Sequence, residues 1–293
     1  MNNQVKRAVI PAAGLGTRML PISHAVPKEM LPIVDLPAVY YLVEEAVNSG
    51  ITDILIITNR DKDAMEDFFD HSPAYEAQLR SKGRHEEADR IRNIANMANV
   101  YFLRQKEAKG LGHAVYCART FVGNEPFVVL YGDDIIFSKT PVCRQLIDTY
   151  EAYGRAAVGV KAVSKEWIAK YSSLKIAPID GRNDCFFCDD MIEKPKPGQE
   201  FSEYSILGRV LLTPDIFDIL KDQAPGAGGE IQLTDAMATL ARTKGITALD
   251  FEGQRFDMGS KLGFLTANVI RGVEHPETKD AFRDFLKEFV RTL

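Results

Sequence analysis

The sequence predicts an α/β fold, in which helices flank a mainly parallel central sheet and a smaller antiparallel lobe follows. Short runs rich in Val, Ile and Leu alternate with helical segments up to residue 131. Such near-continuous apolar strands are typical of a parallel sheet that is covered on both faces. Beyond residue 140, two strand-like segments flank a turn at 180–184, which is the pattern of an antiparallel hairpin. The 293 residues, 45% of them apolar, suffice for a large core.

In the first half of the chain, strands alternate with helices. We expect strands at 7–10, 53–58, 100–103 and 126–131, and helices at 40–47, 61–70, 76–97 and 112–121. The first strand ends at Pro11, where a loop begins, and Gly50 marks the end of the first helix. The stretch 76–97 interleaves acidic and basic residues, so we expect one helical segment with a solvated face.

The second half has a less regular order of elements. We expect helices at 142–153, 214–221, 230–243, 261–271 and 279–292, and strands at 155–163, 174–179, 185–192, 205–212 and 246–251. The sequence contains no repeat, low-complexity segment or obvious linker. We therefore expect a single domain of residues 1–293 with two halves, about 1–140 and about 141–293.

Charge and hydropathy exclude several classes of function. The 36 Lys and Arg residues against 41 Asp and Glu give a formal net charge of −5. Proteins that bind nucleic acid usually carry a basic surplus, so we expect no nucleic-acid partner. No apolar run approaches the roughly 18–20 residues that span a bilayer, and the first ten residues lack the apolar segment of a signal peptide. We expect a cytoplasmic protein that does not bind membranes.

The cysteines and histidines do not predict a metal centre. The pair Cys185-Phe186-Phe187-Cys188 has the spacing of a redox or zinc motif, but a zinc site would need a second pair. We favour two thiols in the hairpin of a protein from a reducing compartment. The five histidines do not have the spacing of metal ligands either.

A glycine-rich segment, Ala12-Ala13-Gly14-Leu15-Gly16-Thr17-Arg18, follows the first predicted strand. Its two glycines allow a tight turn whose N–H groups can approach phosphate oxygens, and its arginine adds a cation. A plain turn between a strand and a helix is the alternative. The segment is not a P-loop, because the chain has no Gly-Lys dipeptide. Met19 stands where the dinucleotide fingerprint needs a small residue.

A proline-rich segment comes next, with Lys28 and Glu29 between Pro27 and Pro32. Because proline restricts the backbone, these two charged side chains would be held on a stiff loop near Arg18. A solvated surface ion pair is the alternative. The stiff loop beside a glycine-rich turn favours a functional role.

Two carboxylates are candidate metal ligands. Asp133 directly follows the strand at 126–131, and α/β sheets bind ligands at the carboxyl ends of their parallel strands. Carboxylates there can bind Mg²⁺ when the substrate carries phosphates. A role in capping the next turn is the alternative. Asp257 is the second candidate, because Ser260 is the better cap for the helix that follows.

Together these motifs resemble the signature of the bacterial UTP–glucose-1-phosphate uridylyltransferases, also called UDP-glucose pyrophosphorylases. The most specific part is Pro27-Lys28-Glu29-Met30-Leu31-Pro32-Ile33-Val34-Asp35, whereas Gly16-Thr17-Arg18 marks any nucleotidyl-sugar transferase. The resemblance covers nearly the whole chain. It continues, in the family's order, through residue 105 and the segments 109–114, 132–134, 193–195, 208–209, 229–235 and 256–263.

The resemblance implies a Rossmann-like nucleotidyltransferase fold and the Mg²⁺-dependent transfer of UMP from UTP to glucose 1-phosphate. It implies nucleotide binding by Ala12, Ala13, Gly14, Leu15, Gly16, Thr17, Glu29, Gln105 and Gly110. It implies catalytic contacts to phosphate by Arg18, Lys28 and Lys194, and sugar-phosphate binding by Ser172, Glu193, Lys194 and Leu207. It implies that Asp133 and Asp257 bind Mg²⁺. The first half would bind the nucleotide and the second half the sugar phosphate, in a homodimer or homotetramer.

The chain departs from the family's pattern at two places. Ser172-Ser173 stands where a glycine is usual, and Val210 where an aromatic residue is common. The Cβ of a serine would crowd the sugar pocket if its φ were positive. Sugar specificity therefore stays open.

Three other functions also stay open. A transferase that uses dTTP would share the glycine-rich loop and the acids, although the Pro27–Asp35 segment favours uridine. A regulatory protein that binds nucleotide without catalysis would be expected to lack Arg18, Lys28 or Asp133, and all three are present. A nicotinamide oxidoreductase is disfavoured by Met19.

Overall fold

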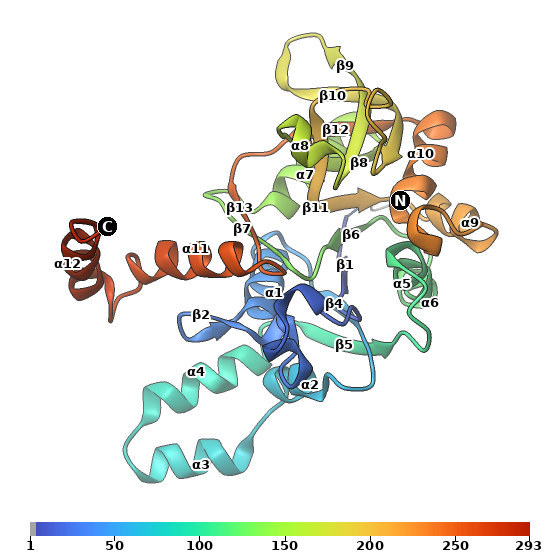
Figure 1. Ribbon diagram of the computed structural model, residues 1–293. Coiled ribbons are helices and arrows are strands. Elements are labelled where there is room, and N and C mark those ends of the chain that lie inside the picture. Colours follow the sequence, from blue (N-terminus) through green and yellow to red (C-terminus); the bar gives the residue numbers. More distant parts are fainter. Residues whose placement is uncertain (1–3) are drawn as a thin grey trace.

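The computed structural model describes residues 4–293, and its central feature is a nine-stranded sheet (Figure 1). The strand order is β5-β4-β1-β6-β11-β8-β12-β10-β9. The strands are β1 (Arg7–Pro11), β4 (Asp53–Thr58), β5 (Asn99–Arg104), β6 (Phe127–Leu130), β8 (Ala156–Ala162), β9 (Ser172–Ile179), β10 (Arg182–Glu193), β11 (Tyr204–Leu212) and β12 (Ile246–Asp250). Only β10 and β11 run opposite to the other seven strands. The predicted α/β fold is confirmed, and the antiparallel hairpin β9–β10 extends the same sheet.

Both faces of the sheet are buried at its centre, which explains the continuous apolar runs of the central strands. Along β1, Ala8 and Ile10 belong to one hydrophobic core and Val9 to the other, and all three are 0% exposed. Successive side chains of a strand point to opposite faces, so β1 contributes to two cores at once. The edge strand β5 is mostly exposed or half-buried.

Two groups of helices cover these faces. The helices α1 (Ala38–Asn48), α2 (Asp63–Phe69) and α7 (Val142–Tyr153) contribute to the first core, and α5 (Leu111–Cys117), α6 (Arg119–Val122), α9 (Asp215–Lys221) and α10 (Leu233–Lys244) to the second. Arg209 on β11 and Glu45 on α1 form an ion pair of 2.7 Å between buried side chains. This pair fixes α1 against the middle of the sheet.

The remaining helices extend from the body. The pair α3 (Pro73–Ser81) and α4 (His85–Ala95) projects beyond the β5 end of the sheet, and α11 (Lys261–Gly272) leads to α12 (Lys279–Val290), far from the sheet (Figure 1). The short helix α8 (Lys165–Ile168) precedes β9. In the part of the chain that the structure describes, no helix is long and apolar enough to cross a membrane.

A two-stranded ribbon that the sequence did not predict is important for the site. Strands β7 (Asp134–Phe137) and β13 (Gln254–Asp257) pair antiparallel, with Asp257 opposite Asp134. Each strand has only four residues, and its partner lies more than 100 residues away in the sequence. The ribbon brings Asp257 next to Asp133, which directly precedes β7. A second small sheet pairs β2 (Pro32–Ile33) with β3 (Leu36–Pro37).

Two of the expected helical segments are divided. The charged stretch 76–97 is wrong as a single helix, because the chain breaks at Gly83, which has a φ of +74°. The expected helix at 112–121 divides into α5 and α6 at Ala118. The hairpin thiols are confirmed, because Cys185 and Cys188 lie buried on β10 and are not paired.

Candidate active site

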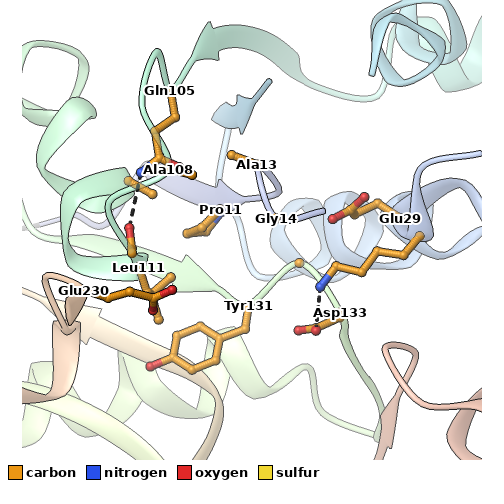
Figure 2. Close-up of a pocket in the computed structure, with 14 residues that line it drawn as sticks. Pro11, Ala13, Gly14, Glu29, Gln105, Ala108, Leu111, Tyr131, Asp133 and Glu230 are labelled. Atoms are coloured by element: carbon orange, nitrogen blue, oxygen red, sulfur yellow. Dashed lines mark hydrogen bonds and ion pairs between the residues drawn. The ribbon is translucent and has the colours of Figure 1, made fainter. Parts of the chain in front are cut away.

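A cavity of about 270 Å³ opens where β1 and β6 end. Its lining comes from several loops: Pro11, Ala13, Gly14, Lys28, Glu29, Gln105, Ala108, Gly110, Leu111, Ala114, Tyr131, Gly132, Asp133 and Glu230. Gln105 lies towards one end and Asp133 towards the other, with Gly14 between them (Figure 2). The cavity therefore lies where an α/β sheet is expected to bind a ligand.

The glycine-rich loop has unused backbone donors, and one of them belongs to Gly14, which lines the cavity. Within residues 4–293, the N–H groups of Gly14, Leu15 and Gly16 donate no hydrogen bond to the protein. A Cβ on Gly132 would lie 2.6 Å from the Pro11 carbonyl oxygen, so the chain can pass this close only with glycine there. Free N–H groups on a close-packed turn suit a ligand with several anionic oxygens.

Four charged side chains converge beside the loop. Lys28 Nζ lies 2.7 Å from Asp133 Oδ2, and Arg18 Nη1 lies 2.7 Å from Asp257 Oδ2. Arg18 Nη2 also lies 3.4 Å from Asp133 Oδ2, which links the two pairs. Gly259 permits this arrangement, because a Cβ there would lie 2.5 Å from the Arg18 guanidinium and 2.9 Å from Asp133 Oδ2.

The two cations determine the protonation of Asp133. Burial alone would raise the pKa of Asp133, but the positive charges of Lys28 and Arg18 outweigh it and hold this pKa below its usual value. Burying the ammonium would lower the Lys28 pKa, but attraction to Asp133 and Glu29 together outweighs this cost and raises the pKa. Asp133, Lys28 and Arg18 are therefore charged at neutral pH, and the cluster can exchange its internal ion pairs for phosphate oxygens or a cation.

A metal ion could be held here only with help from a substrate. Among residues 4–293, no group of three or more His, Cys, Asp or Glu side chains could hold a metal. Asp133 and Asp257 nevertheless converge on one guanidinium, so two carboxylates face the same small space. Mg²⁺ is usually bound by one or two carboxylates together with substrate phosphates and water. The donor set fits Mg²⁺ bound in that way.

A buried lysine that no sequence motif singled out holds two of the loops around the cavity together. Lys62 Nζ lies 2.7 Å from Glu29 Oε2 and donates a 2.6 Å hydrogen bond to the Ala12 carbonyl oxygen. Glu29 is 0% exposed, and its other oxygen, Oε1, is buried and has no partner within residues 4–293. Burial raises the pKa of Glu29 despite Lys62, and burial also lowers the pKa of Lys62. Lys62 lies four residues beyond β4. Ligands of α/β sheets bind at the carboxyl ends of parallel strands, so the argument that pointed to Asp133 could also have pointed to Lys62.

Gln105 occupies the other end of the cavity. Its amide Nε2 donates a 3.2 Å hydrogen bond to the Gly110 carbonyl oxygen, which Figure 2 marks with a dashed line. Gly110 has a φ of +97°, and a Cβ there would lie 2.7 Å from the side chain of Glu230. Glycine is thus required for this close approach. Gln105 and Gly110 can present both donors and acceptors to the edge of a planar ring.

The residues expected at the sugar phosphate lie next to this cavity and do not line it. Glu193 accepts a 2.8 Å hydrogen bond from Thr234, and burial raises the Glu193 pKa. Lys194 is half-exposed and has a φ of +47°. Ser172 is buried, and its N–H and hydroxyl both contact the Ser205 hydroxyl. Leu207 is buried in the first core.

Within the glycine-rich loop, not every expected residue faces the cavity. Leu15 is 71% exposed, and with Thr17 it lines a separate hollow on the other side of the loop. Gly16 packs against the stem of Lys28, and its φ of +66° favours glycine. Tyr131 and Glu230 line the cavity although no motif singled them out as ligands. Tyr131 directly precedes the recognised segment 132–134, and Glu230 lies within the recognised segment 229–235.

The residues of the cavity and of the charged cluster lie in a part of the chain that matches a known protein family. The model of a family described as nucleotidyl transferase matches residues 7–271, which include the whole cavity and the charged cluster. The chain belongs to the nucleotidyl transferase family.

This nucleotidyl transferase is most informatively compared with three proteins. It is 48% identical over 99% of its length to a UTP–glucose-1-phosphate uridylyltransferase of Bacillus subtilis, 97% of which is covered. A UTP-bound UGPase from Acinetobacter baumannii is 36% identical and matches with a TM-score of 0.89, over 97% of this chain and 99% of that one. A putative glucose-1-phosphate thymidylyltransferase from Bacillus anthracis is only 23% identical. It matches with a TM-score of 0.71, over 94% of this chain and 96% of that one. The last likeness shows the fold alone. The expected resemblance to the uridylyltransferases is confirmed.

Proposed function

We propose that this nucleotidyl transferase is a UTP–glucose-1-phosphate uridylyltransferase. The enzyme transfers UMP from UTP to glucose 1-phosphate and releases pyrophosphate. The observation that carries the proposal is one continuous cavity with a base-sized amide site at Gln105 and Gly110 at one end. The charged cluster of Arg18, Lys28 and Asp133 lies at the other end, where a triphosphate would follow its nucleoside.

The nucleotide would bind along the glycine-rich loop. Gln105 and Gly110 would meet the edge of uracil, and the Ala12–Thr17 loop would follow the ribose and phosphates with its free N–H groups. Glu29 would contact the nucleotide at the cavity wall, where its ion pair with Lys62 holds it in place. Arg18 and Lys28 would bind the triphosphate in exchange for their present carboxylate partners.

Catalysis would rest on positioning and charge neutralisation. A phosphate oxygen of glucose 1-phosphate attacks the α-phosphorus of UTP in line, the bond to the bridging oxygen breaks, and pyrophosphate leaves. The nucleophile is already an anion, so no residue needs to remove a proton. Arg18, Lys28 and Lys194 would offset the repulsion between the two anionic substrates and the charge that develops on pyrophosphate.

We propose Mg²⁺ as the metal and Asp133 and Asp257 as its ligands. When bound, Mg²⁺ would supply positive charge between the phosphates of the two substrates. The lowered pKa of Asp133 keeps this ligand ionised. Gly259 leaves room for both carboxylates to turn towards the same point.

The second half would bind the sugar phosphate. Glu193 would accept hydrogen bonds from glucose hydroxyls, and Lys194 would contact the phosphate, with Ser172 and Leu207 forming the surroundings. Ser172 pairs with Glu193 between β9 and β10 and does not have a positive φ, so its Cβ does not strain the backbone there. The homodimer or homotetramer and the cytoplasmic location stay predictions.

Pyrophosphate release with Mg²⁺ and glucose 1-phosphate tests the proposal, with UTP, dTTP, ATP and CTP compared in parallel. A clear preference for UTP is expected. A preference for dTTP would keep the metal and phosphate sites but overturn the assignment of the base site. Release with none of the four nucleotides, from folded protein that binds UTP, would overturn the proposed reaction.

A further inference from the structure

The side-chain amide of Gln105 has two acceptors, and both lie on the same side. Gln105 Nε2 is 3.2 Å from the Gly110 carbonyl oxygen and 2.9 Å from His113 Nδ1. A carbonyl oxygen can only accept, so the NH₂ group of the amide must face Gly110. The same NH₂ group then donates its second hydrogen to His113.

This geometry also determines the tautomer of the imidazole. Because His113 Nδ1 accepts from Gln105, it carries no proton, and the ring is neutral with its hydrogen on Nε2. His113 Nε2 lies 4.0 Å from the Cys117 sulfur, a weak acceptor. Burial and the positive charge of Lys109 lower the His113 pKa, although Glu107 acts in the opposite direction. A neutral ring is consistent with this environment.

With both amide hydrogens used, the Gln105 oxygen is left for a ligand. Within residues 4–293, Oε1 makes no hydrogen bond, and Gln105 lines the cavity while His113 does not. Position 3 of uracil carries a hydrogen that an oxygen can accept. Position 3 of cytosine carries a lone pair, which an oxygen would repel. The orientation of one amide therefore distinguishes the two pyrimidines.

We infer that His113 is a positioning residue that selects uracil over cytosine by holding the Gln105 oxygen towards the cavity. The inference rests on the proposed function, which places the base at Gln105. His113 acts through Gln105 and never touches the nucleotide. Without the acceptor at position 113, only the Gly110 carbonyl, at 3.2 Å, still opposes rotation of the amide. The turned amide, which presents its NH₂ group to position 3 and favours cytosine, then becomes more populated.

Two substitutions at this position form a matched pair. In His113→Asn, the side-chain oxygen takes the place of Nδ1, the same number of bonds from the backbone, so an acceptor is retained. His113→Leu puts a methyl group there instead. His85→Leu, on the exposed start of α4, is the control for loss of a histidine elsewhere. For each protein, kcat and KM are measured with UTP and with CTP.

We expect His113→Leu to lower the ratio of kcat/KM for UTP to that for CTP about tenfold, the scale of one hydrogen bond. The change should come from KM for UTP, with kcat at saturating UTP altered less than about twofold. His113→Asn and His85→Leu should keep the ratio of the unaltered enzyme. An unchanged ratio in His113→Leu, or an equal loss for both nucleotides, would overturn the inference.

A spectroscopic measurement on the unaltered enzyme covers the case in which His113→Leu does not fold. Nitrogen NMR of histidine-labelled protein should show His113 as a neutral ring with a proton on Nε2 and none on Nδ1. A proton on Nδ1 would overturn the inference while leaving the proposed function intact. Conversely, an unaltered enzyme that prefers a nucleotide other than UTP would overturn the proposed function itself, and the inference with it.

Discussion

Replacing Lys62 by Met would leave a carboxylate buried without its cation. Methionine keeps the length and the apolar stem of lysine but loses the ammonium that lies 2.7 Å from Glu29 Oε2. Glu29 is 0% exposed, and its second oxygen already has no partner in the part of the chain that the structure describes. With Lys62 gone, neither oxygen would be paired with a cation, so the folded protein must take up a proton on Glu29.

The cost of that proton can be worked out from the ordinary glutamate pKa of 4.5. Holding the carboxyl protonated costs about 1.4 kcal/mol for every pH unit above this value. Lys62→Met should therefore lower the free energy of unfolding by at most about 3 kcal/mol at pH 7, and by at most about 1 kcal/mol at pH 5.5, because burial already raises the Glu29 pKa in the unaltered protein. The sign follows because a folded-state pKa above the unfolded value stabilises the protein at low pH, and this stabilisation is lost as the pH rises.

Urea denaturation of both proteins between pH 5.5 and pH 8 measures this difference. A double variant, Lys62→Met with Glu29→Gln, is the matched control, because it removes both charges. The free energy of unfolding of this double variant should be only about 1–2 kcal/mol lower, because of the missing hydrogen bonds. This loss should not depend on pH. The difference in the free energy of unfolding between Lys62→Met and the unaltered protein should, by contrast, grow with pH. If this difference stays constant across the range, it is not caused by burial of the Glu29 charge, and the reasoning is refuted.

Three further substitutions test the site. Lys28→Ala should lower kcat by about 10²–10³, the scale for one lost transition-state donor, and pyrophosphate release measures it; a change below threefold would contradict its catalytic role. Asp133→Ala should abolish Mg²⁺-dependent turnover in a magnesium titration, so near-normal turnover would show that the ligand assignment is wrong. Gly110→Ala should lower kcat/KM for UTP about 10- to 100-fold by displacing Gly110 from Glu230. Gly181→Ala, with a similar φ of +78° and open space around it, should leave this value unchanged.

The parts of the fold that depend on local pattern could be predicted from the sequence. The expected helix at 142–153 agrees with α7 at both ends, and the strand at 53–58 agrees with β4. The strand is a continuous run of apolar residues, and the helix ends where Gly154 follows it. The Ser260 cap is also confirmed, since its hydroxyl accepts a hydrogen bond from the Gly263 N–H. Asp257 is therefore not the cap of this helix, and its carboxylate accepts hydrogen bonds from Arg18 and from the Gly259 N–H.

Features that depend on distant partners could not be predicted in this way. The β7–β13 ribbon has no alternating pattern long enough to identify, and only its pairing explains how Asp257 reaches Asp133. Lys62 lies at the start of the charged segment 61–70, which the sequence predicts as a helix and which gives no sign of a buried lysine. It is buried because the Ala12 carbonyl and Glu29 lie around it. Loop packing, rather than local sequence, created this part of the site.

In the proposed reaction, this cavity joins UMP to glucose 1-phosphate directly. The most direct test supplies UTP labelled at its α-phosphorus together with Mg²⁺ and glucose 1-phosphate, and follows the label and the pyrophosphate in the same reaction. We predict one labelled UDP-glucose for each pyrophosphate released, and no label on the protein. Release of pyrophosphate with the label in free UMP, or retained on the protein, would contradict the claim.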